Sequence, residues 1–213
     1  MKTKFIIIRH GFSEANDRQL FAGHAEFPLT EIGKKQAERC AKALRNEKID
    51  AIYSSDIGRA YETAKPIAAS HSLDIIIHQG LREIYAGEWE GVSFATLNEK
   101  YSDSFGIWRT DLGCACPDGG ESIAEVFDRV TNALCEIAKE NEGKTVCITT
   151  HATPVRAVTV ASMGGSYADM SKVEWTPNAS INVFEFEDGK LTAIDLDRVD
   201  HLGDICTKLP TNV

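Results

Sequence analysis

The feature that most limits how this chain can fold is a short apolar segment near its start. Residues 5–8 are one phenylalanine and three isoleucines, and Arg9, His10 and Gly11 follow directly. Such a run, bounded by charge and glycine, is typical of a strand that is buried on both faces of a sheet. Ligands of open parallel sheets bind beyond the carboxyl ends of the strands, so we expect Arg9 and His10 to face a crevice.

Similar strand-like segments recur along the chain and alternate with amphipathic helical segments. Strands are predicted at residues 50–55, 73–78 and 144–150, and helices at residues 31–46, 56–70 and 123–137. Residues 180–187 and 190–197 alternate in polarity and are joined by Asp188 and Gly189, which predicts a hairpin. We therefore predict an α/β fold, a three-layer α/β/α sandwich whose mostly parallel sheet carries an antiparallel hairpin at its edge.

The length of the chain bounds the number of domains. A chain of 213 residues is long enough for one substantial core, so we predict a single domain over residues 1–213. Residues 86–120 are rich in glycine and aromatic residues but lack one long periodic helix. Because loops of this length are uncommon unless they are functional, we interpret this segment as a lid with short helices.

Composition and charge exclude several classes of protein. The formal net charge of −9 argues against a nucleic-acid partner, because phosphate backbones favour basic surfaces. No apolar run is long enough for a signal peptide or a membrane span, so we expect a cytoplasmic protein with no membrane partner. Cys114 and Cys116 lack a second cysteine or histidine pair at zinc spacing, so no metal site is predicted.

Polar side chains stand at or just after each predicted parallel strand. Arg9 and His10 follow the first strand, and His151 follows the fourth. Arg59 lies early in the helix that the second strand enters, and Glu83 comes shortly after the third strand. Because the carboxyl ends of parallel strands meet at one edge of a sheet, we expect these five side chains to share one crevice.

This set of side chains suits a phosphoryl group. Guanidinium groups match phosphate oxygens with paired, charge-assisted hydrogen bonds, and a helix that begins near Ala152 would add backbone N–H donors. The sequence has neither a P-loop nor a cluster of aspartates for magnesium, so metal-free chemistry without a cofactor is favoured. A histidine can then act as the nucleophile on phosphorus.

Several motifs extend this pattern, in order, over nearly the whole chain. They are Arg9-His10-Gly11 with Asn16, Ser54-Ser55-Asp56 with Arg59-Ala60 and Thr63-Ala64, Leu81-Arg82-Glu83 with Gly87-Glu88-Trp89-Glu90-Gly91, Pro117-Asp118-Gly119-Gly120-Glu121-Ser122, and His151. Together they resemble the motifs of the histidine phosphatase superfamily, in its phosphoglycerate mutase-like branch. The resemblance implies the phosphoglycerate mutase-like fold.

The resemblance also implies a two-step reaction on a phosphomonoester. His10 would attack phosphorus and become a phosphohistidine, while Arg9, Arg59 and His151 hold the phosphoryl oxygens. Glu83 would protonate the leaving alcohol and later take a proton from the attacking water. The remaining residues that it assigns to substrate binding are Asn16, Ala22, Gly23 and Ala152. Two interpretations of Arg109 remain: its side chain contacts a second anionic group of the substrate, or it lies solvated on the surface.

Phosphatase is the preferred activity, and two alternatives stay open. In the mutases of this family, a tyrosine and a lysine that grip phosphoglycerate correspond to Ala86 and Phe94 here, so the carboxylate would be poorly held. The sequence resembles small bacterial broad-specificity phosphatases and α-ribazole phosphatases, and this resemblance implies a small phosphorylated metabolite as substrate. The alternatives are a cofactor-dependent phosphoglycerate mutase and a non-catalytic phospho-ligand-binding protein. The sequence is also compatible with a homodimer. We assign no role to Asn178.

Overall fold

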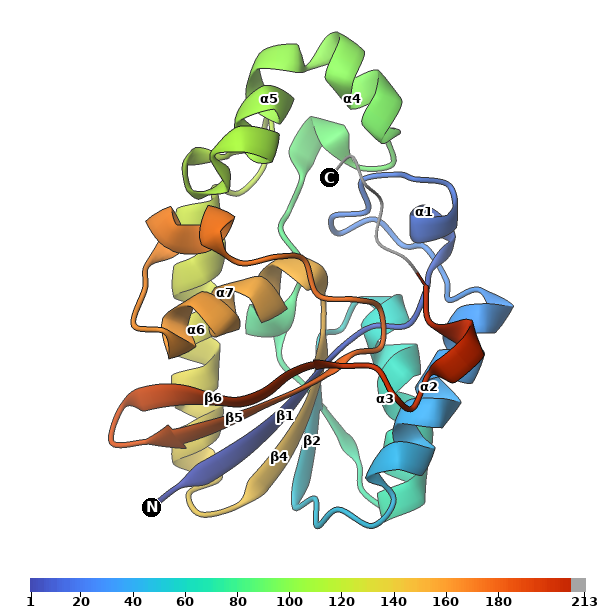
Figure 1. The fold of residues 1–213 in the computed structure, drawn as a ribbon, viewed down its shortest axis with the longest axis vertical. Coiled ribbons are helices and arrows are strands. Elements are labelled where there is room, and N and C mark those ends of the chain that lie inside the picture. The colour runs from blue at the N-terminus through green and yellow to red at the C-terminus, as the bar shows by residue number, and fades with distance from the viewer. Residues whose placement is uncertain (208–213) are drawn as a thin grey trace.

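Six strands form one mixed sheet within residues 1–207, the part of the chain that the computed structural model describes (Figure 1). The strand order is β3-β2-β4-β1-β5-β6. The bounds are β1 Thr3–Arg9, β2 Ala51–Ser54, β3 Ile75–Ile77, β4 Thr145–Thr150, β5 Ile181–Glu187 and β6 Lys190–Arg198. The first four strands pair in parallel, whereas β5 and β6 are antiparallel, which confirms the predicted sheet. The single-domain prediction also covers residues 208–213, which lie outside the described residues.

The apolar segment of β1 supplies both cores of the sandwich. β1 lies between β4 and β5, and residues 5–8 are fully buried. Side chains alternate across a strand. Phe5 and Ile7 therefore join the core on one face, which includes Val130, whereas Ile6 and Ile8 join the core on the other face.

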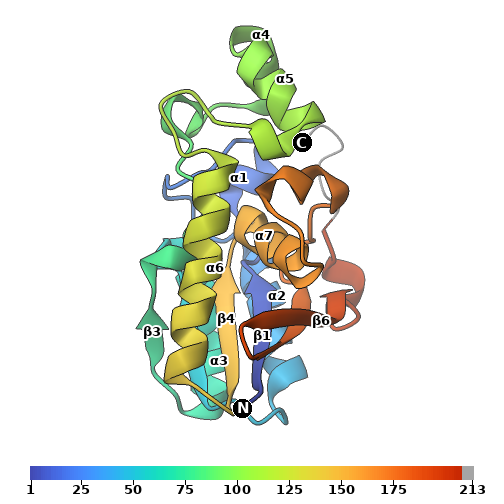
Figure 2. The same cartoon turned by 90° about the vertical axis from the view of Figure 1, so that its left-hand side faces the viewer.

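Helices cover both faces of the sheet (Figure 2). The bounds are α1 Glu14–Asp17, α2 Glu31–Leu44, α3 Gly58–His71, α4 Phe94–Lys100, α5 Ser102–Thr110, α6 Ile123–Glu140 and α7 Ala152–Ser162. Short 3-10 turns lie at Gln79–Leu81, Gly87–Trp89, Leu112–Cys114, Tyr167–Lys172 and Gly203–Ile205. Residues of α2 and α3 pack in one core and residues of α6 and α7 in the other, so the predicted three layers are confirmed. None of the helices in residues 1–207 combines the length and hydropathy that a membrane crossing requires.

The predicted third strand is shorter than its isoleucine run suggested. β3 covers only Ile75–Ile77 instead of residues 73–78, and the side chains of Ile76 and Ile77 are 45% and 44% exposed. β3 pairs only with β2 and forms an edge of the sheet, so fewer elements cover it than cover β1. A run of β-branched residues favoured a strand but did not determine how deeply it is buried.

Residues 86–120 form the predicted excursion with short helices. α4 and α5 stand beyond the carboxyl ends of the parallel strands, at the top of Figure 1. Trp89 is fully buried and meets Phe21, Phe105 and Trp108 in edge-to-face contacts with ring centroids 5.4 to 6.0 Å apart. This aromatic cluster fixes the excursion to the body of the protein, above the end of the sheet.

We expect Ser122→Ala to lower the free energy of unfolding by about 1 kcal/mol. Ser122 caps α6 by accepting from the backbone N–H of Glu125, whose side chain accepts in return from the backbone of Ser122. Urea unfolding measures the change. Asp128→Ala removes an exposed side chain from the same helix and should stay within about 0.5 kcal/mol of the wild type. Equal losses in the two variants would contradict the capping role.

Candidate active site

Parallel pairing of β1 and β4 places two histidines side by side. Arg9 pairs with Thr150 in the register of these strands, and His10 and His151 are the next residues of each chain segment. The imidazole rings of His10 and His151 have centroids 5.2 Å apart and are inclined by 60°. Both rings are buried. The sheet therefore brings together two side chains that are 141 positions apart in the sequence, as the difference between their numbers shows.

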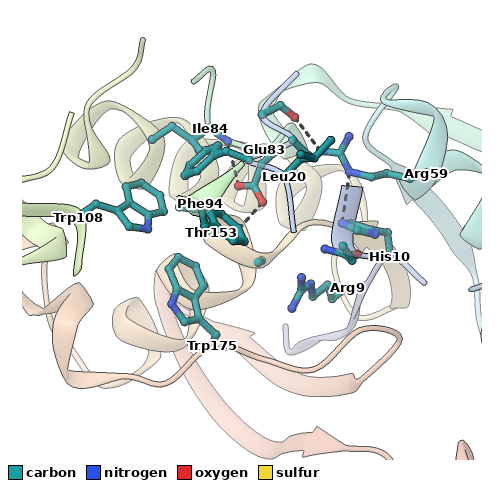
Figure 3. Close-up of a pocket in the computed structure, with 15 residues that line it drawn as sticks. Arg9, His10, Leu20, Arg59, Glu83, Ile84, Phe94, Trp108, Thr153 and Trp175 are labelled. Carbon is teal, nitrogen blue, oxygen red and sulfur yellow. Dashed lines mark hydrogen bonds between the residues drawn. The ribbon is translucent and has the colours of Figure 1, made fainter. Parts of the chain in front are cut away.

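Arg59 reaches the same place from the first turn of α3 (Figure 3). Its Nε donates to Nε2 of His10 over 3.3 Å. Its terminal nitrogens donate to the backbone oxygens of Ala25, at 3.0 Å, and of Gly23, at 2.7 Å. These carbonyls fix the plane of a guanidinium that is only 1% exposed.

The hydrogen bonds of His10 determine its tautomer. Nδ1 lies 2.7 Å from the backbone oxygen of Gly11, and a carbonyl can only accept, so Nδ1 carries the proton. Nε2 accepts from Arg59 and holds the lone pair. Burial, followed by the charges of Arg59 and Arg9, holds the pKa of His10 well below its usual value of 6.5. The imidazole is therefore neutral at neutral pH, as a nucleophile must be.

Two buried nitrogen atoms beside His10 have no hydrogen-bond partner among the described residues. They are Nε of Arg9 and Nδ1 of His151. Arg9 also donates to the backbone oxygen of Thr176 at 2.6 Å, and Nε2 of His151 lies 2.9 Å from Oγ of Ser55. Burial lowers the pKa of Arg9 to about 10, so its guanidinium keeps its charge at neutral pH. Burial and the charge of Arg59 lower the pKa of His151. An anion here would gain hydrogen bonds and a positive environment.

Glu83 faces this group from the other side of the pocket (Figure 3). Its Oε1 accepts from the backbone N–H of Ile84 at 2.9 Å, and its Oε2 accepts from that of Thr153 at 3.5 Å. Thr153 lies in the first turn of α7. The backbone oxygen of Glu83 accepts from Nε2 of His24, at 2.8 Å, and from Arg129, at 3.2 Å. Side chain and backbone of Glu83 are both fixed, which suits a group that must transfer protons in a set direction.

One pocket holds most of the predicted site residues. Its lining consists of Arg9, His10, Asn16, Leu20, Phe21, Ala22, Gly23, Arg59, Glu83, Ile84, Phe94, Trp108, Ala152, Thr153 and Trp175. His151 does not line it but lies directly against His10. Within residues 1–207, no group of three histidine, cysteine, aspartate or glutamate side chains is arranged to hold a metal ion.

Arg109 is the one predicted substrate-binding residue that lies away from the pocket. Its side chain is exposed and donates to Oδ1 of Asn98 at 3.1 Å. α5 buries Phe105 and Trp108, and the residue after Trp108 is turned by about 100° toward solvent. Of the two alternatives for Arg109, the structure fits the solvated surface position, so a contact to a second anionic group is withdrawn.

Three residues of the pocket region escaped the sequence analysis. Trp175 lines the pocket, Thr176 accepts from Arg9, and Asn178 donates to the backbone oxygen of His10 at 3.1 Å. Asn178 also donates to Oδ1 of Asn16 at 3.0 Å. The sequence predicted the hairpin but not the strand that it pairs with. The antiparallel pairing of β5 with β1 places the start of β5 where β1 ends, so the loop before β5 adjoins the site.

Comparison with known proteins agrees with this geometry. Residues 5–197 match the histidine phosphatase superfamily (branch 1). Phosphoserine phosphatase 1 of Hydrogenobacter thermophilus is 36% identical over 94% of this chain and 95% of its own length. Metal-independent phosphoserine phosphatase of Arabidopsis thaliana is 32% identical over 95% of this chain and 84% of its own length.

The solved structures give the same result. The structure of YhfR from Bacillus stearothermophilus superposes with a TM-score of 0.89 at 28% identity, over 94% of this chain and 99% of that one. The family match, the relatives and the shared fold cover nearly the same residues. This chain belongs to branch 1 of the histidine phosphatase superfamily.

Proposed function

We propose that this chain is a metal-independent phosphomonoesterase that moves the phosphoryl group of a small phosphorylated metabolite first to His10 and then to water. The enzyme is a phosphatase of its superfamily, and its relatives include proteins named as phosphoserine phosphatases. One observation carries the assignment of roles. The lone pair of a neutral His10 and two buried cations share a pocket with a fixed carboxyl group.

In the first step, Nε2 of His10 attacks phosphorus as the bond to the leaving oxygen breaks. Arg9 and Arg59 supply fixed positive charge to the phosphoryl oxygens, and the backbone N–H of Ala152 at the start of α7 adds a donor. Glu83 gives its proton to the departing alkoxide, which leaves as an alcohol. The products of this step are a phosphohistidine and a glutamate anion.

In the second step, water attacks the phosphohistidine as the bond between phosphorus and Nε2 breaks. The Glu83 carboxylate takes a proton from this water and returns to its starting form. Inorganic phosphate leaves, and Nε2 of His10 regains its lone pair while Nδ1 keeps its proton against Gly11. The same carboxyl group thus serves both half-reactions from one position.

The surroundings of the pocket favour hydrolysis over transfer to a second substrate group. The positions that correspond to the carboxylate-gripping residues of the mutases are occupied by Ala86, which is fully buried, and by Phe94, which lines the pocket. Neither side chain carries charge. A phosphoglycerate carboxylate would therefore lose its hydration without an ionic partner at these positions.

We expect His10→Ala to abolish release of phosphate from p-nitrophenyl phosphate, because no nucleophile remains. Glu83→Gln should still release about one equivalent of p-nitrophenolate, since this good leaving group needs little protonation, and then stall. The stalled enzyme should carry an acid-labile phosphate on His10, detected with labelled substrate and peptide mapping. Wild-type turnover in His10→Ala, or no label on His10 in either the wild type or Glu83→Gln, would overturn the covalent route.

The depressed pKa values of His10 and His151 also predict how stability depends on pH. Below pH 6.5 the unfolded chain binds protons on these imidazoles that the folded chain does not. The free energy of unfolding should therefore fall as pH decreases from 6.5 to 5, by up to about 1.4 kcal/mol per pH unit for each imidazole. Urea titrations should give a shallower slope for His10→Gln. An identical slope would show that His10 is not held neutral by the fold.

A further inference from the structure

The pocket has two chemically different ends (Figure 3). Arg9, His10 and Arg59 gather at one end, and Trp108 and Trp175 lie at the other. The apolar residues that line the pocket, here called the aromatic wall, are Leu20, Phe21, Ile84, Phe94, Trp108 and Trp175. Phe94 and Trp175 are half-buried, so part of each ring is free to meet a ligand.

The wall is rigid because its rings are packed against other groups. The rings of Trp108 and Trp175 stack with centroids 5.8 Å apart and 17° between planes. Behind Trp175, the guanidinium of Arg156 lies 4.3 Å from the ring centroid and donates to the backbone oxygen of Met170 at 2.7 Å. The rings of Phe21 and Trp108 meet edge to face, with centroids 5.0 Å apart. A preformed apolar surface costs a ligand little ordering energy when it binds.

No charged side chain accompanies the aromatic wall among the described lining residues. The charged or titratable members of the lining are Arg9, His10, Arg59 and Glu83, which the proposed reaction uses. Arg109, the nearby candidate cation of α5, is turned away to Asn98. The buried indole Nε1 of Trp108 has no hydrogen-bond partner in residues 1–207.

We infer that the preferred substrate is the phosphomonoester of an uncharged alcohol that carries a ring, and not phosphoserine. This inference rests on the proposed phosphatase function and assigns its leaving group. A ring would cover the exposed parts of Phe94 and Trp175, which removes apolar surface from water. The ammonium and carboxylate of phosphoserine would instead lose water against uncharged side chains.

Three alkyl phosphates separate the effect of a ring from the effect of charged groups, because all three have a similar leaving oxygen. Benzyl phosphate has a ring, ethyl phosphate is small and uncharged, and O-phosphoserine is charged. We expect kcat/KM for benzyl phosphate to exceed that for ethyl phosphate about tenfold or more, and phosphoserine to rank last. Preference for phosphoserine over benzyl phosphate would overturn the inference and leave the phosphatase function intact. Absence of turnover and of phosphohistidine with every ester would instead refute the proposed function.

Variants test whether the aromatic wall causes the preference. Trp175→Ala and Phe94→Ala should each reduce the ratio of kcat/KM for benzyl over ethyl phosphate by about fivefold or more. Tyr167→Ala is the matched control, because Tyr167 is an exposed aromatic residue outside the pocket. It should leave that ratio unchanged. A ratio that stays high in both pocket variants would assign the preference to other residues.

A second inference comes from the contacts of Arg129 in α6. Its guanidinium donates to the backbone oxygens of Gly80 and Arg82, each at 3.0 Å, and of Glu83 at 3.2 Å. It also binds both carboxylate oxygens of Glu121 at 2.9 Å. Glu121 in turn accepts from the backbone N–H of Tyr85 at 2.9 Å. One ion pair therefore holds the chain on both sides of Glu83.

We propose that Arg129 is a positioning residue for the proton transfer by Glu83. This proposal also rests on the proposed function, in which Glu83 serves both half-reactions, and the test below isolates the leaving-group step. Arg129→Met would free the backbone around Glu83, so the carboxyl group would spend less time aligned with the leaving oxygen. Loss of alignment harms leaving groups that need a proton and spares those that do not.

Rapid-mixing experiments test this split. In Arg129→Met, single-turnover release of p-nitrophenolate should keep at least half of its wild-type rate, whereas single-turnover cleavage of benzyl phosphate should slow about tenfold or more. Arg82→Met is the control, because Arg82 pairs with Asp56 and its side chain does not contact Glu83. Equal slowing of both substrates, or no slowing of benzyl phosphate, would overturn the positioning role. Absence of cleavage of both substrates by the wild type would refute the proposed function instead.

Discussion

The register of the parallel strands is the constraint on which the candidate site depends. Ile8 and Ser54 both pair with Thr149, so β1, β2 and β4 end level with one another. The Thr149 hydroxyl donates to Oγ of Ser54 at 2.9 Å, which ties β2 and β4 together at this edge. A slip of one residue would exchange the faces of every side chain in the strand. The same pairing that buries the core therefore places His10 beside His151.

Burial of positive charge makes this site costly for the free protein and suitable for an anion. Arg9 and Arg59 are each less than a tenth exposed, and Glu83 is the one carboxylate among the described lining residues. Backbone oxygens of Gly23, Ala25 and Thr176 compensate part of the lost hydration. Both imidazoles stay neutral because burial disfavours their charged form and because protonation would add to the positive charge of the arginines. A phosphate group supplies the missing negative charge, and its binding offsets a desolvation that the fold has already completed.

The residue pattern predicted the parts of the site that strand ends position, the family resemblance supplied loop residues such as Asn16 and Gly23, and Trp175 was missed. Arg9, His10 and His151 follow apolar runs, so their location is a consequence of the sheet. Arg109 and Trp175 belong to segments whose direction depends on tertiary packing, and periodicity carries no information on that. Gly11 makes a contact that the sequence does not reveal. A Cβ there would lie 2.5 Å from the backbone oxygen of Gly33, so glycine is needed for the close approach to α2.

The phosphate end of the pocket is built by the central strands, and the aromatic end is built by segments outside them. This separates the residues of the reaction from the residues that select the substrate. The phosphate end rests on strand register, which many buried contacts of β1 and β4 maintain. The aromatic wall comes from the loop that holds Leu20 and Phe21, from residues 84–108 and from the loop that holds Trp175, all outside the central strands. Within this wall, Phe94 and Trp175 are only partly buried at the margin of the core, so substitutions at these two positions disturb fewer core contacts than substitutions in the strands. A relative with the same histidines and arginines can thus accept a charged alcohol, while the side chains at positions 94 and 175 direct this enzyme to a ring.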